Sequence, residues 1–265
     1  MPSPGEYLDL LDPLANHPLN RGLVFLWLGL EHLSGGGSVY DLTNRTAGGV
    51  PTGGPTWIAW KDGFAALSFD GINDYVSVPT LPKLPDDYTV VMEVTPSGGL
   101  LDQYLLADWS FAERNFLFRL EGSEIVELLN GDGTTNQDST CTGNALSIGS
   151  RYVIGARRSG STFNVWQDGI QVASVAGAHS GGSTSNTVNL FADGSGTSNF
   201  PGSCGLVAIY DRALSDGEML GVADQICGCY PDTLRRVSNR VWSFGADQGG
   251  VAATGYKYLP LLGVG

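Results

Sequence analysis

Positively charged side chains are scarce in this sequence. Its 265 residues include 14 Lys and Arg against 27 Asp and Glu, which gives a formal net charge of −13 at pH 7. Because proteins hold the phosphates of nucleic acids mainly with Lys and Arg, nucleic acid is not an expected partner. The surplus of carboxylates favours a cation instead, and calcium is the cation that carboxylate-rich loops bind.

Cysteine and histidine are also few. The three histidines lie far apart in the sequence, and the four cysteines are Cys141, Cys204, Cys227 and Cys229. One residue separates the last two cysteines, a spacing that is too tight for an easy mutual disulfide and that differs from the two-residue gap of zinc knuckles. We expect free or structural cysteines and no zinc site.

Long apolar runs are absent. The most apolar run, residues 23–30, has eight residues, whereas a helix needs about twenty to cross a bilayer. We therefore expect a buried strand there and no membrane insertion. Residues 1–6 contain no basic region that leads into an apolar stretch, so the sequence as written predicts no secretory signal.

Sequence signatures of catalysis are missing too. The chain has no Gly-x-x-x-x-Gly-Lys phosphate loop, and residues 145–149 have Ala where a serine nucleophile elbow needs its first Gly. Glu121, Glu124 and Glu127 are three residues apart, so neighbours in this series face opposite sides of a strand. We expect a solvated acidic edge at these residues and no enzymatic activity.

Short β-rich runs separated by turn-forming residues are abundant. The chain contains 38 Gly, and no long segment with a helical period follows Arg21. Apolar and polar residues alternate through Tyr88–Val94, and Phe116, Phe118 and Leu120 occupy alternate positions further on. This pattern predicts antiparallel strands that each turn one face toward a core.

Two local signals predict how elements are connected. Asp168-Gly169 separates two β-rich runs, and this pair favours the positive φ angles of a tight hairpin turn. Ser215 and Glu218 have the spacing of a capping box, so we expect one short helix to begin there.

Composition divides the chain into three parts. Residues 1–20 are rich in proline and predict an N-terminal arm. Residues 21–228 contain the β-rich runs and form the expected main domain. Beyond Tyr230-Pro231 the chain becomes rich in Gly and Ala, so we expect residues 229–265 to form a C-terminal extension.

Four segments resemble, in the right order, the strands of laminin G-like, concanavalin A-like jelly rolls. They are Ala66–Val76, which is similar to the opening signature of that family, Tyr88–Val94, Asn164–Gly169 and Gly205–Ser215. The resemblance implies an all-β fold of two antiparallel sheets packed face to face, with one short C-terminal helix. Jelly-roll glycosidases carry a Glu-x-Asp-x-x-Glu strand, and this sequence has no such string.

The resemblance also bears on metal binding. Many relatives have an acidic residue in the closing strand where this chain has Gly205, and their metal sites use carboxylates near the opening and closing strands. Of such ligands Asp70, Asn73 and Asp74 are the candidates here. Independently, residues 130–138 place oxygen-bearing side chains, among them that of Asp132, at alternate positions, which indicates either a calcium loop or a polar hairpin loop. No cofactor is required, and calcium is the candidate.

Aromatic residues supply candidates for sugar binding. Stacking on an aromatic ring beside a carboxylate or amide is how sugar sites are built. We expect such a site at Trp109, Trp166 and Tyr104, with Asp108 as the neighbouring carboxylate.

Three functions follow as hypotheses. The preferred one is a non-enzymatic, virion-associated structural or decoration protein, because the chain resembles laminin G-like proteins encoded by tailed phages. Assembly in the host cytoplasm, contacts with capsid or other virion proteins through residues 1–20 and 230–265, homo-oligomers and cell-surface glycans belong to this hypothesis. The alternatives are an extracellular, calcium-assisted lectin and, more remotely, a glycoside hydrolase whose carboxylates meet only in the folded chain.

Overall fold

The computed structural model describes residues 18–29, 37–60, 65–81, 84–99, 102–109, 114–131, 137–177, 188–193 and 198–223, without the side chains of residues 18, 109, 114, 115, 137 and 138. The chain divides into two units between residues 229 and 230, and the second unit lies entirely outside the described residues. The predicted C-terminal extension, most of the predicted arm, Asp132, Cys227 and Cys229 lie outside the described residues.

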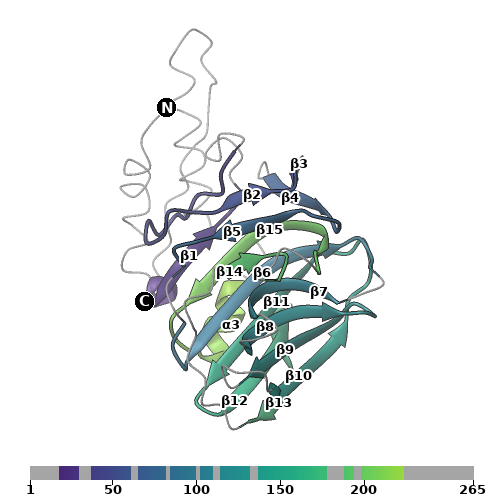
Figure 1. The fold of residues 1–265 in the computed structure, drawn as a ribbon. Coiled ribbons are helices and arrows are strands. Elements are labelled where there is room, and N and C mark those ends of the chain that lie inside the picture. Colours follow the sequence, from purple (N-terminus) through teal and green to yellow (C-terminus); the bar gives the residue numbers. More distant parts are fainter. Residues whose placement is uncertain are drawn as a thin grey trace, which may run out of the picture. The chain divides into compact units, whose positions relative to one another are not determined.

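Antiparallel strands make up most of the described chain (Figure 1). A 3-10 turn η1 (Pro18–Asn20) precedes them, and helix α3 (Asp216–Gly221) follows them. The strands are β1 (Leu23–Trp27), β2 (Val50–Thr52), β3 (Thr56–Ala59), β4 (Ala65–Asp70), β5 (Tyr75–Val78), β6 (Tyr88–Pro96), β7 (Gln103–Trp109), β8 (Arg114–Glu121), β9 (Ile125–Gly131), β10 (Gln137–Ala145), β11 (Tyr152–Ser159), β12 (Thr162–Gln167), β13 (Ile170–Ala176), β14 (Val188–Leu190) and β15 (Pro201–Tyr210).

The strands form two sheets. One has eight strands in the order β13-β12-β11-β6-β15-β4-β3, with β1 also paired to β15. The other has seven strands in the order β10-β9-β8-β7-β14-β5-β2. The prediction of an all-β sandwich of two antiparallel sheets with one short C-terminal helix is confirmed.

The main core lies between the two sheets. Val90, Met92 and Val94 of β6 turn toward it from the eight-stranded sheet, and Phe118 and Leu120 of β8 turn toward it from the seven-stranded sheet. The alternation seen in the sequence therefore predicts the inward faces correctly, because successive strand residues point to opposite sides.

Strand β1 is buried on both faces. All five of its residues are buried, and it pairs with β15 along the register Leu26–Ala208 and Trp27–Val207. The apolar run at residues 23–30 thus begins as a buried strand, as expected. In the described ranges, no helix is long and apolar enough to span a bilayer.

The predicted hairpin joins β12 to β13. Asp168 and Gly169 have φ angles of 49° and 76°, the positive values that such a turn requires. The Asp168 carboxylate also accepts the N–H of Val153 at 2.9 Å, which ties the turn to β11.

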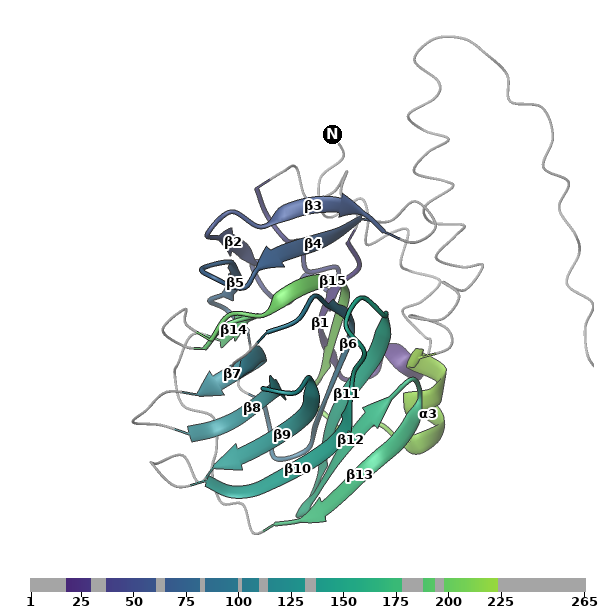
Figure 2. The ribbon, with the colours of Figure 1, turned by 90° about the vertical axis from the view of Figure 1, so that its right-hand side faces the viewer.

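Helix α3 begins at the predicted capping box. The Ser215 hydroxyl accepts the N–H of Glu218, and the Glu218 carboxylate accepts the N–H of Ser215. The helix packs on the eight-stranded sheet at Gly155, where a Cβ atom would lie 2.7 Å from Cε of Met219. Figure 2 shows α3 beside β12 and β13, on the side of that sheet away from β7, β8 and β9.

Two of the four cysteines are described. Cys141 and Cys204 are free and buried, which confirms the expectation for this pair. Burial raises the pKa of both thiols, so they remain neutral parts of the core.

Candidate functional site

The predicted metal ligands Asp70, Asn73 and Asp74 lie in the turn between β4 and β5. Asp70 Oδ1 accepts the N–H of Ile72 at 2.8 Å, and Asp74 Oδ2 accepts the N–H of Asp70 at 2.9 Å. Burial raises the pKa of the Asp74 carboxyl, with the N–H of Asp70 opposing that rise and the charge of Asp70 adding to it. The carboxylates therefore close the turn through backbone hydrogen bonds.

This turn is a poor fit for a structural cation. Two of its carboxylate oxygens already accept backbone N–H groups, whereas calcium takes six to eight oxygen ligands. Among the described residues, no group of three or more His, Cys, Asp and Glu side chains is placed to hold a metal. Calcium binding stays a prediction, since Asp132 lies in the connection between β9 and β10 outside the described ranges.

The indole of Trp60 lies against the closing strand at Gly205. A Cβ atom at Gly205 of β15 would lie 2.4 Å from Nε1 of Trp60, so the Trp60 ring covers this glycine. A carboxylate side chain does not fit at Gly205 without displacement of the ring.

Trp166 is covered by its neighbours. Only 5% of the surface of this residue is exposed, and the Arg157 guanidinium lies 5.1 Å from the ring centre. Arg157 in turn bonds the carbonyl of Leu214 and the carboxylate of Asp216 at the start of α3. So small an exposed area leaves little room for a sugar ring to stack on Trp166.

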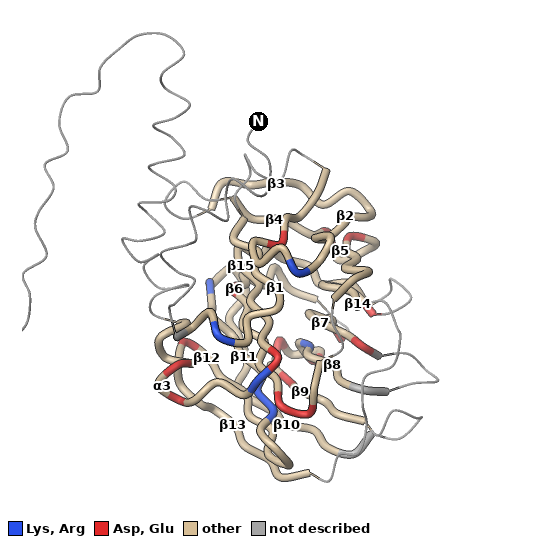
Figure 3. The backbone as a smooth tube through the Cα atoms, turned by 90° about the vertical axis from the view of Figure 1, so that its left-hand side faces the viewer, with Lys and Arg blue, Asp and Glu red and all other residues tan. Residues whose placement is uncertain are grey.

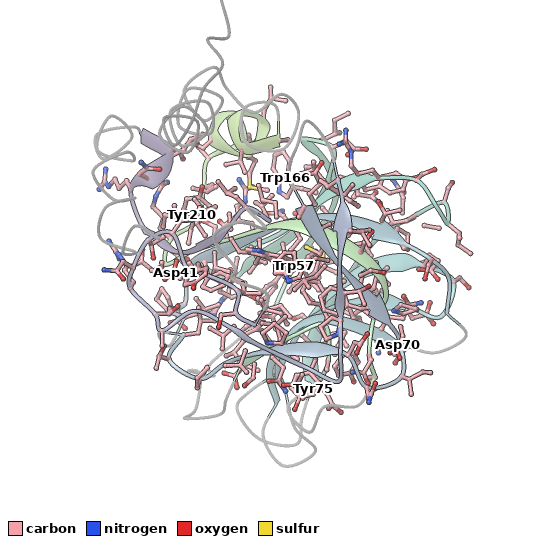
Figure 4. All side chains as sticks on the ribbon, turned by 90° about the horizontal axis from the view of Figure 1, so that it is seen from above. Asp41, Trp57, Asp70, Tyr75, Trp166 and Tyr210 are labelled. Carbon is pink, nitrogen blue, oxygen red and sulfur yellow. The ribbon has the colours of Figure 1, made fainter. Side chains whose placement is uncertain are left out.

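The four predicted sugar-binding residues do not converge on one site. Trp166 belongs to the eight-stranded sheet, whereas Tyr104, Asp108 and Trp109 belong to β7 of the seven-stranded sheet. Figure 4 places Trp166 near α3, well away from Asp70 and Tyr75 of the predicted metal turn. Asp108 is fully buried opposite Phe116, and the side chain of Trp109 lies outside the described part of the chain.

Tyr104 is the predicted residue that reaches the outer face of the seven-stranded sheet. The strand register places Tyr104 beside Arg119, Arg119 beside Glu127, and Glu127 beside Thr142. Tyr104 and Arg119 are half-buried, Glu127 is buried and Thr142 is exposed. Four strands thus contribute one polar row across the sheet.

An ion-pair network holds this row. Nε and Nη2 of Arg119 donate to Glu127 Oε2 at 3.1 and 2.8 Å, and Nη1 of Arg119 donates to Asp102 Oδ2. The hydroxyl of Thr142 donates to Glu127 Oε1 at 3.0 Å. Both carboxylates are therefore oriented around a single guanidinium.

A small apolar cluster lies next to the polar row. It contains Ala107, Leu117 and Leu129, with Tyr104 packed against it, and it is separate from the main core. The register pairs Ala107 with Leu117 and Leu117 with Leu129 across β7, β8 and β9. We call the polar row, Asp102 and this cluster together the β7–β9 face.

The expected solvated acidic edge is wrong for two of its three residues. Glu127 is buried in the β7–β9 face, and Glu124 is buried where it accepts the N–H of Gly99 and the Nε2 amide of Gln103. The signal that could have found the Arg119–Glu127 pair is the short turn between β8 and β9, which brings residues eight apart into register.

Charge on the described surface is mixed. Figure 3 shows basic positions of the described tube interspersed with acidic ones rather than gathered into one basic stripe. Arg157, Arg158 and Arg212 are paired with Asp216, Asp86 and Glu218 respectively. That nucleic acid is not a partner stays a prediction from the net charge.

Comparisons with known proteins place this geometry in a family. The model of the concanavalin A-like lectin/glucanases superfamily, in its laminin G form, matches residues 70–219. A comparison with curated protein sequences finds no match.

Solved structures share the fold at low sequence identity. Domain 4 of AbnA, a GH43 extracellular arabinanase from Geobacillus stearothermophilus in complex with arabinotriose, has a TM-score of 0.57 and 16% identity, over 76% of this chain and 98% of that domain. The binding domain of Paraclostridial Mosquitocidal Protein 1 has a TM-score of 0.63 and 12% identity, over 78% of this chain and 53% of that one.

A botulinum neurotoxin type C structure, described with an interaction with two ganglioside molecules, has a TM-score of 0.61 and 7% identity, over 78% of this chain and 52% of that one. This chain thus spans nearly all of the arabinanase domain but about half of each toxin chain. At these identities the solved structures show the shared fold alone. The family model covers more than half of the sequence, and the chain belongs to the concanavalin A-like lectin/glucanases superfamily.

Proposed function

We propose that this chain is a non-enzymatic carbohydrate-binding protein whose sugar site is the β7–β9 face. The observation that carries the proposal is the row Tyr104–Arg119–Glu127, held by hydrogen bonds beside an apolar cluster. A sugar presents an apolar ring face edged by hydroxyls, so it needs an aromatic or apolar surface next to fixed polar groups. On this face the half-buried Tyr104 supplies the aromatic surface and the polar row supplies the fixed polar groups, while Ala107, Leu117 and Leu129 are buried and pack against Tyr104.

The solved structures support the class of ligand but not its identity. The arabinanase domain was solved with arabinotriose, and the toxin structure concerns gangliosides. Both belong to the same fold as this chain, and a fold of this kind hosts many functions. The choice of the β7–β9 face therefore depends on its own side chains.

The arrangement of carboxylates favours binding over hydrolysis. Glycoside hydrolysis needs two carboxyl groups facing each other across the scissile bond. Here both oxygens of Glu127 are engaged, one by Thr142 and one by Arg119, and Asp102 bonds the same guanidinium. A glycoside hydrolase is the second candidate, because the matched domain is part of an enzyme, the GH43 arabinanase. Release of reducing sugar from arabinan or β-glucan would support it.

The wider setting that we propose is the surface of a virion, with a soluble calcium-assisted lectin as the alternative. The sequence resemblance to phage-encoded proteins supports the virion, where residues 1–20 and 230–265 would contact capsid proteins. Density-gradient sedimentation of the source lysate distinguishes the virion protein from the soluble lectin. Co-migration of the chain with large particles in stoichiometric copies supports a virion protein, and recovery as a free species contradicts it.

Sugar binding is tested with a glycan array, followed by calorimetry on the strongest ligand. The variant Tyr104→Ala removes the aromatic ring of the face, and we expect at least a tenfold loss of affinity. The matched control is Tyr40→Ala, which removes an exposed tyrosine outside this face and should leave affinity unchanged. Calcium and a chelator are compared in parallel to test the calcium-assisted alternative.

A second variant guards against misfolding. Thr142→Val keeps the β-branched shape of an exposed residue but removes the hydrogen bond to Glu127 Oε1. If both variants keep the wild-type circular dichroism spectrum and bind the ligand as tightly as the wild type, the β7–β9 face is not the sugar site.

A further inference from the structure

The charges on the β7–β9 face do not balance. Arg119 contributes one positive charge, whereas Asp102 and Glu127 contribute two negative charges that both bond to it. The group of three therefore carries a net charge of −1. The whole chain carries −13, so its long-range field adds to the repulsion of an anionic ligand.

The donors of Arg119 are largely used within the protein. A guanidinium has five N–H donors, and its Nε and Nη2 edge matches a carboxylate in a forked pair. Glu127 takes this edge, with Oε2 accepting from both nitrogens at 3.1 and 2.8 Å. Nη1 donates to Asp102. A ligand carboxylate would have to displace one of these partners or become a third negative charge beside them.

Partial burial strengthens these charge interactions. The side chains of Arg119 and Glu127 keep only 16% and 11% of their surface exposed. The charge of Glu127, which has so little contact with water, is weakly screened, so an added carboxylate meets a strong repulsion from it. Salt added to the buffer would therefore weaken the repulsion between Glu127 and a ligand carboxylate only slightly.

The face also offers an acceptor that suits a hydroxyl. The Asp102 side chain is 43% exposed, and its Oδ1 makes no hydrogen bond among the described residues, because Oδ2 is the atom that bonds Arg119. Sugar hydroxyls donate to a carboxylate in charge-assisted hydrogen bonds. An uncharged saccharide supplies such donors without adding charge.

We propose that the β7–β9 face selects uncharged saccharides and rejects those that carry a carboxylate, namely uronic acids and sialic acids. The proposal depends on the function proposed above, since it assumes that the face binds sugar. Asp102 and Glu127 are the specificity-determining residues, and Arg119 holds both in place.

The test uses two pairs of probes that differ in charge. Galactotriose is compared with trigalacturonate, and lactose with 3′-sialyllactose, by calorimetry on the full chain at low and at physiological salt. We expect the wild type to bind the neutral member of each pair at least tenfold more tightly. The preference should persist at physiological salt, since the charges are partly buried.

Variants that change the charge of the β7–β9 face show whether that charge sets the preference for uncharged saccharides. The double variant Asp102→Asn with Glu127→Gln keeps the shapes but changes the charge of the group from −1 to +1 and frees Arg119. We expect it to gain at least tenfold in affinity for trigalacturonate, while galactotriose gains nothing. The control Asp211→Asn removes one negative charge from an exposed residue outside this face and should leave the preference unchanged.

Each outcome decides between the proposals. Equal or tighter binding of the acidic probes by the wild type, abolished by Tyr104→Ala, overturns the selectivity and leaves the sugar site standing. If the wild type binds neither class of probe and no glycan on the array, both the proposed function and the selectivity are overturned.

Discussion

Single glycines constrain this sandwich where the backbone comes close to itself. Gly29 has a φ angle of +57°, and a Cβ atom on it would lie 1.8 Å from the carbonyl oxygen of Ala65. The N–H of Ala65 donates to the carbonyl of Gly29 at 2.6 Å, so the two segments cannot separate without the loss of that bond. At Gly217, in helix α3, an added Cβ atom would have no neighbouring atom within 4 Å.

We predict opposite effects of alanine at these two positions. Gly29→Ala adds both a clash with backbone and strain in φ, and we expect a loss of about 3 kcal/mol or more in the free energy of unfolding. Gly217→Ala adds helix propensity in open space, and we expect a gain of up to about 1 kcal/mol. Urea denaturation measures both. Equal stability of the two variants would show that the close approach at Gly29 is absent in solution.

At the scale of elements, helix α3 is held to the sheet by its first turn. Arg212 donates from Nη1 and Nη2 to the two oxygens of Glu218, at 3.0 and 2.7 Å, and the Ser215 hydroxyl donates to the same carboxylate. The hydrogen bonds from Arg212 lower the pKa of Glu218 to about 2, against the opposing effect of burial. The ionised Glu218 therefore stabilises the folded state.

This pKa shift predicts how stability depends on pH. The folded pKa of about 2 lies below the ordinary value of 4.5, so the stabilisation is complete above about pH 4.5 and is lost as the pH falls toward 2. We expect Glu218→Gln to cost about 2 kcal/mol at pH 7 and progressively less below pH 4.5. Denaturant titrations between pH 7 and pH 3 measure the difference. Arg212→Gln should remove the same pH-dependent part, and a constant difference at every pH contradicts the assignment.

At the scale of the molecule, both sheets share one core. Phe118 of the seven-stranded sheet and Phe163 of the eight-stranded sheet are fully buried members of the same apolar cluster. Neither sheet can keep its inner face out of water without the other, because each has one apolar side. The described strands should therefore unfold together.

We predict a single cooperative unfolding transition. Truncation of a core side chain should lower the free energy of unfolding equally in either sheet. Phe118→Ala and Phe163→Ala should each lower the free energy of unfolding by about 3 to 5 kcal/mol, through lost burial and a residual cavity. Far-ultraviolet and near-ultraviolet circular dichroism should give coincident melting curves in both variants. Two separated transitions would mean that the sheets fold independently.

Much of the fold could be predicted because its signals are local. The alternation in Tyr88–Val94, the Asp168-Gly169 turn and the capping box at Ser215 each depend on a few consecutive residues, and the structure confirms all three. The candidate site was harder to predict. Tyr104 was found by residue type, but its partners Arg119 and Glu127 become neighbours only when β7, β8 and β9 pair.

The sequence by itself thus determined the class of fold and the inward faces of its strands, since residue type and spacing act over short distances, and it determined an acidic net charge. Only the tertiary structure decided that Glu127 is buried against Arg119 and that Trp166 is covered by Arg157, which bonds to the start of α3. Burial and ion pairing depend on which distant segments are brought together. They are properties of the packed sheets, and no single strand contains them.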